Sequence, residues 1–123
     1  MANSRPDRLR AYSEVVDFGL IVGEGFGLPD AREEIATLSL TSEEAGVLQL
    51  LDEIVIEFLI DPTHWIDDYV LRDDPAQPLS RWWWHLGKLR AGVYPAELLP
   101  KHLQDIYRQN SIYKRLRANA VST

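Results

Sequence analysis

Carboxylates and one histidine recur at helical spacing in the middle of the chain, at Glu53, Glu57, Asp61, His64 and Asp68. Residues four apart lie on one side of a helix, so the first three share a face, and the last two can share a face of a following helix. Such groups bind divalent metals in all-helical enzymes. The paired Glu-x-x-His repeat of di-iron bundles is absent, and a proline interrupts the one Asp-x-x-His. The pattern therefore favours the polar edge of a buried helix, and a metal-dependent helical enzyme is kept as an alternative.

Three consecutive tryptophans lie in a segment that also carries arginine and tyrosine. Consecutive helical residues are about 100° apart, so three indoles span about 200° of a helix and one face cannot take them all. These residue types dominate the energetics of protein interfaces. We therefore expect a partner or dimer surface that contains Arg81, Trp82, Trp83, Trp84, Arg90 and Tyr94. In the alternative, a helix sandwiched between others holds all three rings inside the protein.

The C-terminal part is rich in basic side chains, with tyrosines between them. These residues are Lys101, Tyr107, Arg108, Tyr113, Lys114, Arg115 and Arg117. Basic and aromatic side chains together suit phosphate contacts and base stacking. No nucleic-acid-binding motif is readable, however, and the chain is acidic overall, whereas a nucleic-acid-binding domain is expected to be basic. A nucleic-acid-binding regulator is therefore an alternative that the sequence disfavours.

The elements that must position these side chains are helices separated by prolines and glycines. The apolar spacing predicts helices at about 6–21, 30–38, 42–61, 63–71, 81–91 and 100–118. Thr41 or Ser42 can cap the third of these helices, and the proline after Asp61 ends it. Gly92 ends the fifth helix, and Asn110 is a weak point in the last.

The helix at about 42–61 is apolar nearly all round, apart from a narrow polar stripe that contains Glu53 and Glu57. A helix of this kind belongs at the centre of a fold. The sequence thus predicts an all-α protein, a compact bundle of five to six helices around this central helix. We expect a single domain over residues 1–123, with frayed ends at 1–4 and 119–123.

Composition and charge limit the function classes. The chain has 123 residues and no cysteine, which excludes disulfides, thiolate metal sites and cysteine nucleophiles. The polar N-terminus predicts no signal peptide, and no apolar run is long enough to span a bilayer, so we expect a cytoplasmic protein without a membrane partner. Charge is uneven: residues 80–123 hold eight basic and two acidic side chains, and residues 42–79 hold one basic and ten acidic.

No motif identifies a family, a catalytic centre or a cofactor. The tryptophan cluster beside a basic segment favours a small helical interaction protein, which would be an accessory, regulatory or inhibitory partner rather than an enzyme. Its partner would be another protein or a second copy of the chain.

Overall fold

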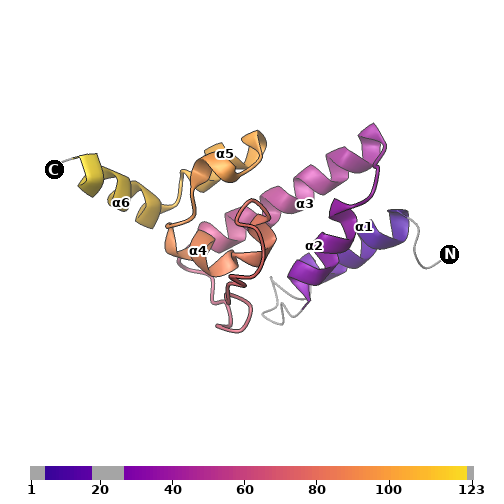
Figure 1. The fold of residues 1–123 in the computed structure, drawn as a ribbon, viewed down its shortest axis with the longest axis horizontal. Coiled ribbons are helices and arrows are strands. Elements are labelled where there is room, and N and C mark those ends of the chain that lie inside the picture. The colour runs from indigo at the N-terminus through magenta and orange to yellow at the C-terminus, as the bar shows by residue number, and fades with distance from the viewer. Residues whose placement is uncertain (1–4, 18–26, 122–123) are drawn as a thin grey trace.

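The computed structural model describes residues 5–17 and 27–121, which fold into helices joined by turns (Figure 1). The α-helices are α1 (Arg5–Glu14), α2 (Leu28–Ala36), α3 (Ser42–Ile60), α4 (Leu86–Ala91), α5 (Lys101–Tyr107) and α6 (Ser111–Val121), and the 3₁₀ helices are η2 (Trp82–Trp84) and η3 (Ala96–Leu98). This architecture confirms the predicted all-α bundle. Of the ends predicted to fray, residues 1–4 and 122–123 lie outside the described residues, as do 18–21 of the first predicted helix, whereas 119–121 belong to α6.

The central helix α3 begins with a capping box. The Thr41 hydroxyl oxygen accepts a hydrogen bond from the Glu44 backbone N–H at 3.2 Å, and the Glu44 carboxylate accepts one from the Thr41 N–H at 2.9 Å. The helix ends at Ile60, two residues before Pro62, which cannot donate a backbone hydrogen bond. Between these ends α3 packs against α1, α4 and α5, so the expected central helix is confirmed.

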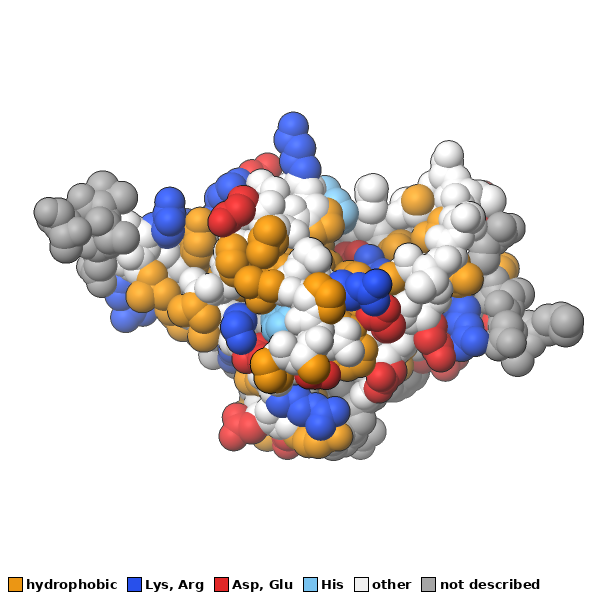
Figure 2. Space-filling view, viewed as in Figure 1, with side chains coloured by type: hydrophobic (Ala, Val, Ile, Leu, Met, Phe, Trp, Pro, Cys, Tyr) orange, Lys and Arg blue, Asp and Glu red, His pale blue; other side chains and the backbone are white. Residues whose placement is uncertain are grey.

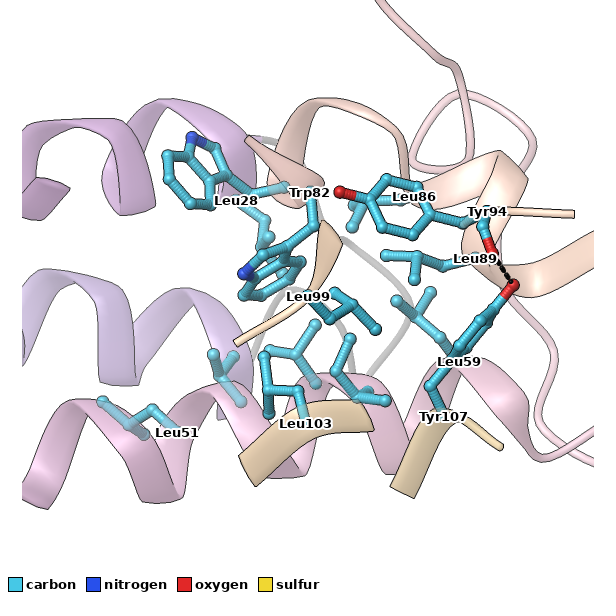
Figure 3. Close-up of a cluster of buried hydrophobic side chains, with 14 of the residues drawn as sticks. Leu28, Leu51, Leu59, Trp82, Leu86, Leu89, Tyr94, Leu99, Leu103 and Tyr107 are labelled. Atoms are coloured by element: carbon cyan, nitrogen blue, oxygen red, sulfur yellow. Dashed lines mark hydrogen bonds between the residues drawn. The ribbon is translucent and has the colours of Figure 1, made fainter. Parts of the chain in front are cut away.

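The apolar core gathers side chains from α1 to α5 and η2, and Figure 3 shows part of it. Two tyrosines close one side of this core, because the Tyr107 hydroxyl donates to the Tyr94 carbonyl oxygen at 2.7 Å and the Tyr94 hydroxyl donates to that of Leu79. Burial raises the pKa of Tyr94 to about 12 and that of Tyr107 well above its usual range. Both hydroxyls therefore stay protonated donors inside the core.

The helix predicted at 63–71 is wrong, because the chain from 61 to 81 follows a series of turns. Aspartates cause this departure by binding the backbone themselves. Asp61 accepts a hydrogen bond from the Thr63 N–H at 2.9 Å, and Asp67 accepts one from the Tyr69 N–H at 2.8 Å. Such local bonds offer the backbone an alternative to the helical hydrogen-bond ladder.

The helix predicted at 81–91 is split into η2 and α4. In a continuous α-helix the Trp84 carbonyl oxygen would accept from the Lys88 N–H. Here it accepts from the Asp74 N–H at 2.9 Å, and the Lys88 N–H donates instead to the Asp73 carboxylate at 3.1 Å. Gly92 then ends α4 as predicted, with a φ of 75° that favours glycine.

The helix predicted at 100–118 is interrupted at its weak point. The Asn110 side-chain oxygen accepts hydrogen bonds from the N–H groups of Ile112 at 2.9 Å and Tyr113 at 3.3 Å, which starts α6 in a new direction. Its amide group donates to the Leu89 carbonyl oxygen at 3.1 Å. α6 therefore points away from the body of the molecule at one end of its long axis (Figure 1).

In the described ranges, no helix combines the length and the apolar character that crossing a bilayer requires.

Substitutions at two glycines should change the stability of the protein in opposite directions, because one glycine is closely packed and the other is exposed. An added Cβ at Gly87 would lie 2.2 Å from the Leu71 carbonyl oxygen, whereas one at exposed Gly46 would meet no atom within 4 Å. Gly87→Ala should therefore destabilise the protein by about 1–3 kcal/mol, because α4 must move away from the 71–73 segment. Gly46→Ala should stabilise it by about 0.5–1 kcal/mol, through helix propensity alone. Urea unfolding measures both, and a stable Gly87→Ala protein would contradict the close approach.

Candidate functional site

The tryptophan segment, the strongest interface candidate in the sequence, is largely enclosed by its own chain. Trp82 is fully buried, Trp83 is 7% exposed and Trp84 is partly buried. Trp82 and Trp83 meet edge to face, with ring centroids 5.7 Å apart. A 3₁₀ helix has three residues per turn, so the three rings point in three directions and meet different neighbours.

One carboxylate holds this segment in place. Glu33 of α2 accepts hydrogen bonds from the indole N–H groups of Trp83 at 3.0 Å and Trp84 at 2.7 Å, and it also accepts one from the Arg81 guanidinium. Burial alone would raise the pKa of Glu33, but the three donors together lower it below its usual value of 4.5. The sequence carried no signal for this role, because Glu33 is one of several acids in a short predicted helix.

A second carboxylate, Asp52 of α3, lies deeper in the fold. Arg32 donates to both of its oxygens at 3.0 Å, and the Tyr12 hydroxyl donates to one of them at 2.7 Å. The Arg32 guanidinium also lies over the ring of Trp83, 4.5 Å from the centroid. Burial raises the pKa of the Asp52 carboxyl, although Arg32 and Tyr12 favour its charged form. Sequence reasoning missed this residue, but Asp52 does interrupt the apolar side of the predicted helix, away from the polar stripe.

The other predicted interface residues also have contacts within the chain. Tyr94 is buried, Arg81 binds Glu33, and Arg90 donates to backbone carbonyl oxygens at the end of α3. Arg81 and Trp84 keep part of their surface exposed. Contact between this segment and a partner stays a prediction.

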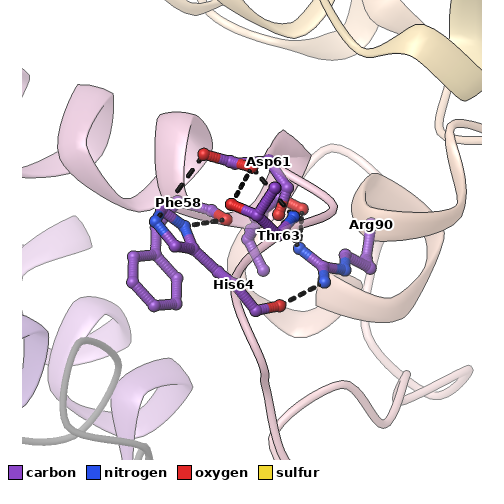
Figure 4. A network of polar contacts seen from close by, with 6 residues as sticks. Phe58, Asp61, Thr63, His64 and Arg90 are labelled. Atoms are coloured by element: carbon purple, nitrogen blue, oxygen red, sulfur yellow. Dashed lines mark hydrogen bonds and ion pairs between the residues drawn. The ribbon is translucent and has the colours of Figure 1, made fainter.

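Two of the five candidate metal ligands meet at the C-terminal end of α3 (Figure 4). The His64 Nε2 lies 3.6 Å from an Asp61 oxygen, and the His64 ring stacks on Phe58 with centroids 3.9 Å apart. The Asp61 carboxylate is already bound by the hydroxyl and N–H of Thr63, and these two hydrogen bonds lower its pKa. Arg90 donates to the carbonyl oxygens of Leu59, Asp61 and His64, so this cluster terminates the helix.

The remaining candidates, Glu53, Glu57 and Asp68, do not complete a site with this pair. Within 5–17 and 27–121, no three histidine or acidic side chains come together in a way that could hold a metal ion.

A pocket of about 220 Å³ lies between the start of α2 and the turns at 69–74. Its walls include Asp30, Asp73, Asp74 and Arg72. Two of these carboxylates already bind the backbone, because Asp73 accepts from the Lys88 N–H in the first turn of α4 and Asp74 accepts from the Ala76 N–H at 3.0 Å. Arg72 lies over the Tyr69 ring, 4.1 Å from the centroid.

The described surface carries a row of apolar side chains on α3. Val47 is 44% exposed, Leu50 is 63% exposed and Ile54 is 40% exposed. Their spacing of three and four residues places them on one side of the helix, and we call them the α3 row. Glu43, Glu53 and Glu57 surround the α3 row, and none of them forms an ion pair within the described part of the chain. The sequence predicted a narrower exposed side for this helix, consisting only of the polar stripe that contains Glu53 and Glu57.

The basic C-terminal residues divide by environment. Tyr107 is buried and Tyr113 packs against it with ring centroids 5.0 Å apart, so these rings belong to the core and its edge. Lys114, Arg115 and Arg117 of α6 are exposed. In the space-filling view, basic and apolar side chains lie together at the α6 end of the molecule (Figure 2).

The chain matches none of the protein-family models, curated proteins or solved structures with which it was compared. The residues and geometry described above are therefore the basis for assigning a function.

The Arg32–Asp52 pair makes a stability prediction. Asp52→Asn should destabilise the protein by about 3–5 kcal/mol, because the Arg32 charge stays buried without a counter-ion. The double replacement Arg32→Met and Asp52→Leu should cost less, since it leaves no buried charge. Urea unfolding of the three proteins measures this. A double variant that is less stable than Asp52→Asn would show that the buried unpaired charge is not the cause of the stability lost in Asp52→Asn.

Glu33 predicts a dependence on pH. A carboxyl group whose pKa is lower in the folded state stabilises the protein above its ordinary pKa and loses this effect as the pH falls through the folded value. The stability lost on Glu33→Gln should therefore be largest at neutral pH and shrink between about pH 5 and about pH 3. Denaturant unfolding across this range measures the difference, with Glu57→Gln as the control, because Glu57 is exposed and forms no ion pair within the described part of the chain. A loss that is constant with pH would refute the role given to the Glu33 charge.

Proposed function

We propose that this protein is a small helical interaction module that binds a protein partner through the α3 row, as an accessory, regulatory or inhibitory component. The observation that carries this proposal is the exposure of Val47, Leu50 and Ile54 on one side of the central helix. Scattered apolar side chains are normal on a surface, but a row at helical spacing is a typical contact for a second helix. The other exposed large apolar side chains, Trp65, Tyr69, Val93, Leu98 and Leu116, lie on different elements.

The charges around the α3 row specify the chemistry of the partner. Glu43 and Glu57 continue the line of the row at its two ends, and Glu53 lies beside it. A partner helix with an apolar stripe flanked by arginine or lysine would bury the row and pair these free carboxylates. Charge complementarity of this kind sets specificity and association rate more than affinity.

Two synthetic helical peptides with the same leucine stripe, flanked either by arginines or by glutamates, test this proposal. The arginine peptide should bind and shift the NMR resonances of α3, and added salt should weaken it. Leu50→Ser should weaken its binding about tenfold, which is about 1.4 kcal/mol. Val93→Ser, an exposed apolar residue in a turn, is the matched control and should change nothing.

Charge reversal sharpens the same test. In the double variant Glu53→Lys and Glu57→Lys, the preference should pass from the arginine peptide to the glutamate peptide. Equal binding of both peptides by the natural chain, or shifts confined to other elements, would refute the α3 row as the binding surface.

A further inference from the structure

α6 is a helix that the fold anchors at one end only. Its first turn is fixed by Asn110 and by the contact of Tyr113 with Tyr107, and Gly92 lets it approach α4 closely, since a Cβ there would lie 2.6 Å from the Tyr113 nitrogen. Beyond this turn Leu116 is 42% exposed. A helix of 11 residues is marginal in water without tertiary contacts, so the free part of α6 needs a surface to pack on.

The exposed side of α6 is the chemical counterpart of the α3 row. Tyr113 packs on Tyr107 and Ile112 is partly buried, so the exposed apolar contact of the described part of α6 is Leu116. Arg115 and Arg117 stand on either flank of Leu116. Neither arginine forms an ion pair within the described part of the chain. An exposed leucine with basic flanks is the kind of contact that the acidic surroundings of the α3 row favour.

The two surfaces lie far apart in one chain. The α3 row lies along the middle of α3, whereas α6 projects at one end of the long axis (Figure 1). A two-fold axis that places α6 of one copy on the α3 row of the other also places the second α6 on the first α3 row. Such an arrangement contains two equal contacts and is closed, as most homodimers are.

We propose that two copies of this chain form a dimer by exchanging their α6 helices, so that Leu116 of each copy packs on the α3 row of the other. The proposal rests on the proposed function, because it names the occupant of the same surface. Direct pairing of two α3 rows is the competing arrangement, and it would bring Glu43, Glu53 and Glu57 of both copies together. Opposed like charges disfavour that arrangement, whereas Arg115 and Arg117 neutralise the same carboxylates.

Complementary charge reversals on the full chain test the exchange. One variant carries Arg115→Glu and Arg117→Glu, and the other carries Glu53→Lys and Glu57→Lys. The natural chain should sediment as a dimer, and each variant alone should dissociate with a Kd at least about tenfold higher. An equimolar mixture of the variants should restore the dimer, because both exchanged contacts then join opposite charges. The double variant Lys101→Glu and Arg108→Glu, which makes the same charge change on α5, should remain a dimer.

The outcomes separate this proposal from the proposed function. A dimer that survives Arg115→Glu and Arg117→Glu would overturn the α6 occupant, as would a mixture that stays monomeric. A natural chain that is monomeric at all concentrations would overturn the dimer, while the binding of the arginine peptide to α3 would still support the interaction module. Circular dichroism of each variant checks that these substitutions, which lie at exposed or partly buried positions, leave the fold intact.

Discussion

Two opposite charges lie inside this small protein, and the arrangement of its N-terminal half follows from the need to compensate them. Arg32 of α2 and Asp52 of α3 are both buried, and a buried charge is tolerated only with a partner and further hydrogen bonds. α1 supplies one such bond through Tyr12, and η2 supplies the ring of Trp83 over the guanidinium. The adjacent Glu33 then binds two indoles of the same 3₁₀ turn. Three helices and the tryptophan segment are thus fixed relative to one another by two carboxylates.

Local chemistry determined the parts of the fold that the sequence could predict. The ends of α3 follow from the Thr41 capping box and Pro62, and the end of α4 follows from Gly92, because each residue acts on the backbone beside it. The helix predicted at 63–71 failed for a related reason. Its aspartates are as compatible with a first helical turn as with the hydrogen-bonded turns that they form, and the spacing of apolar residues does not separate the two.

The candidate site was less predictable, because it depends on which surfaces are left uncovered. The α3 row belongs to a run of apolar residues that predicted a helix buried nearly all round, and only the packed structure leaves Leu50 outside. The tryptophans show the reverse case, in which side chains expected at the surface are largely buried. Their number and spacing indicated an exposed surface, but the carboxylate of Glu33, about fifty positions away in the chain, satisfies two of the indole N–H groups. Contacts between such distant positions are not readable from residue spacing.

Asn110 lies at the point between α5 and α6 where the chain changes direction. Its amide group donates to the end of α4, its side-chain oxygen accepts from the first turn of α6, and its backbone N–H donates to the carbonyl oxygen of Tyr107 in α5. Asn110 therefore sets the direction of α6 relative to both helices. α6 spans about 16 Å at 1.5 Å per residue. A small rotation at Asn110 therefore displaces the C-terminal end of α6 by several ångströms. When a projecting element joins two copies, its angle decides between a closed ring and an open filament. The direction that the buried Asn110 side chain gives α6 therefore determines the shape of an assembly formed through α6.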